Sequence, residues 1–155
     1  MKGPRKHARE KTPPRKLPNF ALADQFGREL GTTTYEGAPL IVVVGNREGA
    51  TGVALWTAAL RSVLGQDSNT HVLPVAELGN VPRILRRMVS RLLPREQSQW
   101  CALDWDGQLG APIRGTAGPL AAAAYGADHM LRVWTRLPGD AVESALLVKL
   151  VEGAA

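Results

Sequence analysis

Along this chain of 155 residues, segments with the apolar spacing of β-strands alternate with segments that have the apolar spacing of helices. Residues 40–44 are continuously apolar, which is typical of a central strand covered on both faces. Before this run, residues 20–22 and 28–30 flank a turn that contains a glycine, and they predict a hairpin. Shorter apolar or alternating runs predict further strands at 72–76, 100–103 and 130–134.

Helical spacing separates these strands. Apolar residues three and four positions apart predict a helix from about Val53 to Leu64, which Gly65 ends. A second helix is predicted between Pro82 and Pro94. Its apolar stripe consists of Ile84, Leu85, Met88, Val89, Leu92 and Leu93.

Two more helices are predicted towards the C-terminus. Residues 120–125 are rich enough in alanine to predict a short helix. A last helix over 145–151 has Asp140 as its N-cap and Glu143 three residues later, a variant of the capping box. Strands that alternate with helices in this order imply an α/β fold with a mostly parallel sheet covered on both faces.

Composition supports one globular domain, and the positive charge lies outside it. The chain is 45% apolar and 21% charged, and its formal net charge is +5. Residues 1–17 hold seven basic residues and one acidic residue, a net charge of +6, so the remaining chain carries −1. This segment is rich in proline and poor in apolar residues, which is typical of disorder. We therefore expect a basic, disordered tail at 1–17 and one domain at 18–155.

Several functional classes have no signature in the chain. There is no apolar run long enough for a membrane helix or a secretory signal, and a single cysteine excludes an intramolecular disulfide. The chain contains no Walker loop, no His-Glu-x-x-His and no Gly-x-Ser-x-Gly, and its three histidines lack the spacing of metal ligands. We expect a cytoplasmic protein with no cofactor, no metal and no membrane partner.

The N-terminal half carries a series of short motifs in a characteristic order. Residues 18–22 give a proline and an apolar segment, 24–27 an Asp-x-x-Gly turn, and 35–39 a Tyr-x-Gly-x-Pro run before the first core strand. This order resembles the redoxin branch of the thioredoxin-like superfamily, which includes alkyl hydroperoxide reductases and thiol-disulfide oxidoreductases. The resemblance covers residues 18–65. It implies a thioredoxin-like fold, with a mostly parallel central sheet, helices on both faces and an N-terminal β-hairpin.

The resemblance also shows where the family's chemistry would lie. In redoxins, the turn after the core strand carries Cys-x-x-Cys or a lone peroxidatic cysteine. The cysteine lies at a helix N-terminus, and this position lowers the pKa of its thiol. In this chain that window falls on 49–52, with Gly49 and Gly52 at the two cysteine positions. The family's cis-proline, just before the penultimate strand, has no counterpart at 127–129, and little room remains for the return strand of the final hairpin. We therefore expect a domain that has lost redox catalysis.

Cys101 is the one residue that could have retained thiol chemistry. It follows Trp100 in a predicted strand, and no basic residue lies nearby in the sequence to lower its pKa. We expect a buried, unreactive thiol. The alternative is a divergent thiol-dependent antioxidant oxidoreductase with residual peroxidase activity through Cys101.

Two groups of residues are candidates for binding. Glycines in the 45–52 loop and the start of the following helix could accommodate a small anionic ligand. The contacting residues would be Asn46, Arg47, Gly49, Thr51 and Gly52. The tail and the second helix could instead bind nucleic acid or another polyanion. That surface would consist of Lys2, Arg5, Lys6, Arg9, Lys11, Arg15, Lys16, Arg83 and Arg87.

Three functions therefore stay open from the sequence. The first, which we favour, is a non-catalytic thioredoxin-like module that binds a protein partner or a small anionic ligand. The second is a redoxin with residual activity through Cys101. The third is a protein that associates with a polyanion or nucleic acid through its basic tail.

Overall fold

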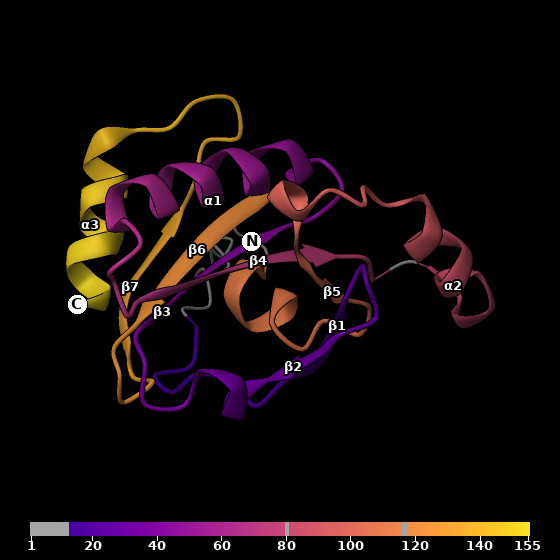
Figure 1. Cartoon of the computed structure of the whole chain (residues 1–155), viewed down its shortest axis with the longest axis horizontal. Coiled ribbons are helices and arrows are strands. Elements are labelled where there is room, and N and C mark those ends of the chain that lie inside the picture. Colours follow the sequence, from indigo (N-terminus) through magenta and orange to yellow (C-terminus); the bar gives the residue numbers. More distant parts are fainter. Residues whose placement is uncertain (1–12, 80, 116–117) are drawn as a thin grey trace, which may run out of the picture.

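A single mixed sheet organises the chain (Figure 1). The computed structural model describes residues 13–79, 81–115 and 118–155. Its strands are β1 (Ala21–Asp24), β2 (Glu29–Gly31), β3 (Leu40–Gly45), β4 (His71–Glu77), β5 (Ala102–Asp104), β6 (Leu120–Tyr125) and β7 (Leu131–Arg136). Its α-helices are α1 (Ala50–Leu64), α2 (Arg83–Leu92) and α3 (Ser144–Ala154), and its short helical turns are η1 (Thr32–Tyr35), η2 (Gln97–Gln99) and η3 (Gly110–Arg114).

The sheet has a parallel centre and antiparallel flanks. Its order is β2-β1-β5-β4-β3-β6-β7. Strands β3, β4 and β5 run parallel, whereas the pairings β1–β2, β1–β5, β3–β6 and β6–β7 are antiparallel. The predicted hairpin is therefore confirmed as β1–β2, but the prediction of a mostly parallel sheet is wrong outside the three central strands.

Strand β6 replaces the short helix predicted at 120–125. It pairs with the whole of β3 on one side and with β7 on the other, and all its residues are buried. Alanine favours helices in isolation, but tertiary pairing overrides this preference when a strand lies between two others. Because 120–125 is a strand, β7 is the return strand of a final hairpin, for which the sequence analysis had expected little room.

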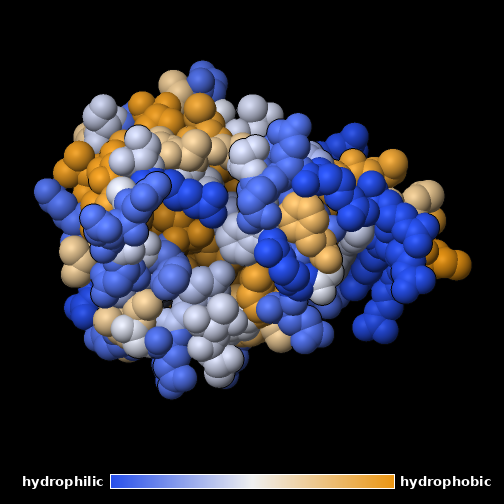
Figure 2. Space-filling view, in the orientation of Figure 1, coloured by the Kyte–Doolittle hydropathy of each residue, from blue (hydrophilic) through white to orange (hydrophobic). Residues whose placement is uncertain are grey.

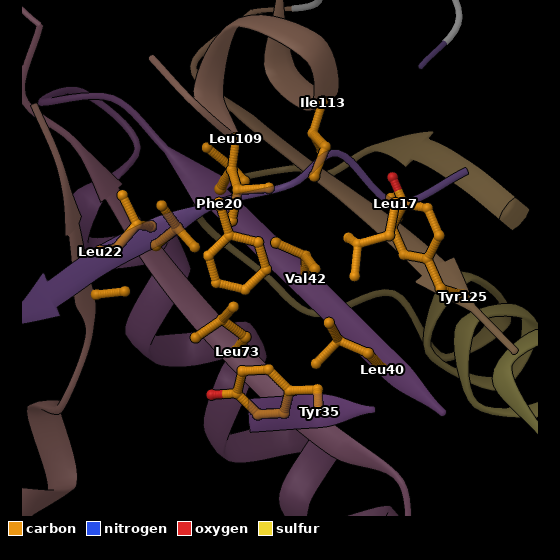
Figure 3. Packing of buried hydrophobic residues seen from close by; sticks show 14 residues of the cluster. Leu17, Phe20, Leu22, Tyr35, Leu40, Val42, Leu73, Leu109, Ile113 and Tyr125 are labelled. Atoms are coloured by element: carbon orange, nitrogen blue, oxygen red, sulfur yellow. The ribbon is translucent and has the colours of Figure 1, made fainter. Parts of the chain in front are cut away.

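The two faces of the sheet are covered by different kinds of structure. On one face α1 and α3 pack over Ile41, Val43 and two β6 alanines, with Trp56 and Leu150 fully buried. On the other face the segment before β1, η1 and η3 cover Leu40 and Val42; Figure 3 shows this core. Helices were expected on both faces, but α1 and α3 share one face, and the opposite core is closed by loops and short helical turns.

The start of α3 differs from the prediction. The helix begins after Glu143, whose backbone is extended, rather than at Asp140, and no side chain caps it. Residues 137–143 are needed to cross from β7 back over α1. Two contacts hold this crossing: the Trp56 indole N–H donates to the carbonyl oxygen of Pro138 (2.8 Å), and the Leu137 N–H donates to that of Leu120 (3.0 Å).

Helix α2 forms where it was predicted, but its apolar stripe does not enter the core. None of its residues is buried. In Figure 1 it projects from the body beyond the hairpin side of the sheet. Hydrophobic periodicity predicts a helix, but it does not show which surface the apolar face meets.

The domain begins before residue 18. Lys16 forms a bridge with Met130, the Leu17 N–H donates to the carbonyl oxygen of His129 (2.9 Å), and the Leu17 side chain is buried in the core. The last residues assigned to the tail are therefore part of the fold. The rest of the predicted tail, residues 1–12, lies outside the described residues.

Asp24 connects the hairpin to the segment before β5. Its fully buried carboxylate accepts hydrogen bonds from the Trp100 indole (2.8 Å), from the Arg28 guanidinium (2.8 Å) and from the backbone N–H groups of Phe26 and Arg28. Burial raises the pKa of Asp24, but the hydrogen bonds from Trp100 and Arg28 lower it by more, so the pKa lies below its ordinary value.

Asp24→Asn is expected to destabilise the fold by about 2 kcal/mol at neutral pH, since charge-assisted hydrogen bonds are lost. Because the pKa of Asp24 is lowered on folding, its contribution is present above the unfolded pKa of about 4 and is lost as the pH falls through the folded pKa. Urea denaturation at neutral pH and in acid, with the exposed Asp67→Asn as control, checks this. A difference from wild type that does not shrink in acid would contradict it.

Candidate functional site

The turn after β3 is closed by the segment that leads into β6. The Asn46 N–H donates to the carbonyl oxygen of Pro119 (3.0 Å). The Gly49 N–H donates to the Asn46 carbonyl (3.0 Å) and to the Asn46 side-chain oxygen Oδ1 (3.1 Å). Asn46 therefore closes the turn internally and ties it to Pro119.

Neither family cysteine position has room for a side chain. A β-carbon built on Gly49 would overlap the carbonyl oxygen of Pro119. One built on Gly52 would lie 2.6 Å from Cδ2 of Leu120 and 3.1 Å from the Cα atom of Gly139. Backbone atoms form part of both obstacles, and backbone cannot move aside as a flexible side chain can. The turn therefore requires glycine where the resemblance implies cysteine.

Pro119 also corrects the expectation about the family's cis-proline. The resemblance puts that residue just before the penultimate strand, and the structure makes β6 the penultimate strand. Pro119 directly precedes β6, so it holds this position rather than residues 127–129. No peptide bond among the described residues is cis, including the one between Gly118 and Pro119.

The predicted ligand residues do not surround a cavity. Arg47 and Thr51 are exposed, while Gly49 and Gly52 are buried against the β6 segment. The Asn46 side chain is bonded within the turn. Neither of the two described cavities includes any of these five residues. The anion-binding role of this loop stays a prediction.

A cavity lies directly beside the turn, between α1, β4 and the segment 93–101. We call it the α1 cavity. Its volume is about 150 Å³, and its lining is mostly apolar. The lining residues on α1 are spaced as one helical face: Ala50, Val53, Ala54 and Thr57. Pro74 and Ala76 of β4 form the floor, and residues from Leu93 to Cys101 form the opposite wall.

Thr57 is the unusual polar residue of the α1 cavity. It is only 4% exposed, and its hydroxyl oxygen Oγ1 has no hydrogen-bond partner in the described part of the chain. A buried hydroxyl without a partner is destabilising by about 1–3 kcal/mol. No motif in the sequence marks this residue. The available signal was a polar side chain at a helical spacing of four from Val53, on the face that enters the core.

Cys101 lies in the wall of the same cavity. Its thiol is half-buried, and its backbone N–H donates to the side-chain oxygen Oε1 of Gln25 (2.9 Å). Burial, together with the negative charge of Asp24, raises the pKa of the Cys101 thiol to about 11. The thiol is therefore protonated at neutral pH. The residue is only partly buried, whereas a buried cysteine was expected, and its lack of reactivity stays a prediction.

A second cavity of about 250 Å³ opens beside the first half of β4, where β5 does not extend. Tyr35, Arg61, His71 and Trp100 are among its lining residues. The Arg61 guanidinium lies over the Trp100 ring, 5.8 Å from its centroid. Trp100 also lines the α1 cavity, so one residue borders both spaces.

The predicted polyanion residues are not brought together by the described structure. Lys2, Arg5, Lys6, Arg9 and Lys11 lie outside the described residues. Arg15 and Lys16 are exposed beside the start of β7, whereas Arg83 and Arg87 are exposed on α2. Figure 1 places β7 and α2 on opposite sides of the molecule.

Two features do not occur in the described ranges. No helix there has both the length and the apolar character needed to cross a membrane. In the same ranges, no three side chains of His, Cys, Asp or Glu are grouped so that they could hold a metal ion.

Comparison with known proteins gives a match in structure but not in sequence. No protein-family model matches the chain, and no curated protein sequence does. Among solved structures, DsbF of Mycobacterium tuberculosis is 15% identical with a TM-score of 0.61, and the match covers 91% of this chain and 98% of that one. The exposed lipoprotein thioredoxin Etrx1 of Streptococcus pneumoniae is 17% identical with a TM-score of 0.62, covering 86% and 98%.

A thioredoxin-family thiol:disulfide interchange protein of Chlorobium tepidum is 12% identical with a TM-score of 0.52, covering 91% and 96%. At such identities the likeness concerns the fold alone. Together with the sheet order and the covering helices, it shows that this chain has a thioredoxin-like fold.

Proposed function

We propose that this chain is a thioredoxin-fold binding module without dithiol chemistry, and that its ligand occupies the α1 cavity. The observation that carries the proposal is the contrast between two adjacent spaces. The turn after β3 has no room for a side chain at Gly49 or Gly52, while a cavity opens along the next two turns of α1. The fold has thus kept an accessible space beside the redox turn and lost the positions for thiols.

Thiol chemistry has little support in the remaining residues. With one cysteine in the chain, an intramolecular dithiol cannot form. At a pKa of about 11, roughly one Cys101 thiol in ten thousand is ionised at pH 7, and the thiolate is the reactive form. Divergent peroxidase activity through Cys101 would therefore need a change in the surroundings of Asp24 and Cys101.

The lining of the α1 cavity defines the ligand class. A cavity of about 150 Å³ is large enough for a six-membered carbon ring. The walls are mostly apolar, and the Thr57 hydroxyl oxygen is buried without a hydrogen-bond partner in the described part of the chain. A rotation of the Thr57 side chain would bring this hydroxyl to the cavity. The ligand is therefore a small apolar group with a single polar atom, either free or as a side chain of a partner protein.

Gly49→Cys is expected to lower the free energy of unfolding by at least about 2 kcal/mol, because overpacking against a fixed backbone oxygen is costly. Thr51, which is exposed in the first turn of α1, is the control, and Thr51→Cys is expected to stay within about 0.5 kcal/mol of wild type. Urea denaturation compares the two variants. Equal stabilities would show that the turn admits a side chain.

Cys101 is expected to react with iodoacetamide at neutral pH about a hundredfold more slowly than an exposed cysteine, because so little thiolate is present. The rate should rise with pH through about pH 11, where half of the thiol is ionised. The control is Ala58→Cys in a Cys101→Ala background, on the exposed side of α1. Labelling of native Cys101 as fast as the control, or peroxide turnover with a thiol reductant that Cys101→Ala abolishes, would favour the residual redoxin.

Thr57→Val is expected to stabilise the protein by about 1 kcal/mol, because it removes a buried hydroxyl without a partner. Urea denaturation measures the difference.

Phenol and benzene are suitable probes of binding in the α1 cavity, with affinities measured by NMR titration. Wild type should bind phenol more tightly than benzene, and Thr57→Val should lose this preference. Ala54→Leu should block both probes by filling the cavity, whereas Ala58→Leu, outside the cavity, should block neither. Binding that Ala54→Leu leaves intact would contradict the proposed site.

A further inference from the structure

Helix α2 presents an apolar ridge to solvent. Ile84 is 88% exposed and Leu92 is 78% exposed, and Met88 between them is more than half exposed. These three residues are four positions apart and so lie on one side of the helix. In Figure 2 the end of the molecule that α2 forms shows apolar atoms among strongly hydrophilic ones. Soluble domains rarely leave such a ridge uncovered unless it contacts another surface.

The opposite side of α2 is attached to the body through Arg86. Its guanidinium Nη2 lies 3.1 Å from the Asp106 carboxylate, its Nε donates to the carbonyl oxygen of Val81 (3.4 Å), and it lies 5.5 Å from the centroid of the Trp105 ring. At 3.6 residues per turn, Arg86 is nearly opposite Ile84 and Met88. These contacts therefore hold the helix with its apolar ridge directed away from the domain.

The charge around the ridge has one sign. Residues 78–95 contain five arginines and no acidic residue. Arg83, Arg87 and Arg91 are exposed and border the ridge along one side. The methylene groups of an arginine side chain can cover apolar surface while its guanidinium stays in a polar environment. Apolar residues next to a row of arginines match the layered chemistry of a bilayer surface, in which phosphates lie above hydrocarbon.

We propose that α2 is an interfacial anchor that docks this protein on an anionic phospholipid surface. Ile84, Met88 and Leu92 enter the outer part of the acyl chains, and the bordering arginines contact the lipid phosphates. A nucleic acid would pair with the arginines but would leave the ridge in water. The expectation of no membrane partner came from the absence of a spanning segment, and an interfacial helix needs none.

The test is flotation with lipid vesicles. The full chain is expected to float with vesicles of phosphatidylglycerol and phosphatidylcholine, to remain unbound with phosphatidylcholine alone, and to be released by salt. The double variant Ile84→Ser/Leu92→Ser should weaken binding at least about tenfold, since two inserted side chains are lost. The matched control is Val63→Ser, an apolar residue of α1 that is about half exposed. Since all these positions are exposed, folding should be retained, as circular dichroism can show.

The same experiments give different results if the basic tail binds the vesicles or if a second copy of the chain covers the ridge. Vesicle binding that the Ile84→Ser/Leu92→Ser variant keeps but that deletion of residues 2–12 removes would assign the affinity to the basic tail and overturn the proposal. A dimer of the full chain, seen by light scattering and lost in the double variant, would make a second copy the occupant and would also overturn it. Vesicle binding by the tail-deleted chain that still depends on Ile84 and Leu92 would support it.

Discussion

The close approach of the Pro119 backbone to the turn after β3 determines the character of this protein. β3 lies inside the sheet, and its backbone groups are shared between β4 and β6. Where it ends, the Pro119 carbonyl bonds to Asn46 and lies where a side chain at Gly49 would have to be. The same strand pairing that stabilises the core thus excludes side chains from the turn. Glycine is a structural requirement there, and a single substitution to cysteine at position 49 would meet the Pro119 backbone.

Local patterns in the sequence predicted the elements whose interactions are local. The continuous apolar run of β3, the spacing of α1 and its end at Gly65 all follow from the residues themselves. The prediction failed at β6, where pairing with β3 and β7 overrides the helical preference of alanine. Because 120–125 was predicted as a helix, the prediction made residues 130–134 the penultimate strand. The position of Pro119 just before the actual penultimate strand, β6, was therefore missed.

The candidate site could be predicted only in part, for a related reason. The glycines at 49 and 52 were identified from the resemblance, but the α1 cavity was not, since its far wall comes from a distant part of the chain. Gln25 fixes that wall by bonding to Gln99 and Cys101, which are 74 and 76 residues away. Contacts between residues so far apart in the sequence leave no periodic pattern of apolar residues by which they could be predicted. Thr57 was visible only as a polar position on a buried helical face.

Trp100 links parts of the molecule that the other residues keep apart. Its indole N–H donates to the Asp24 carboxylate, and the residue lines both cavities. A ligand that entered either space would change the surroundings of Trp100, and a change in indole fluorescence would report it. Displacement of the ring would also break the hydrogen bond to Asp24, which ties the hairpin to the segment before β5.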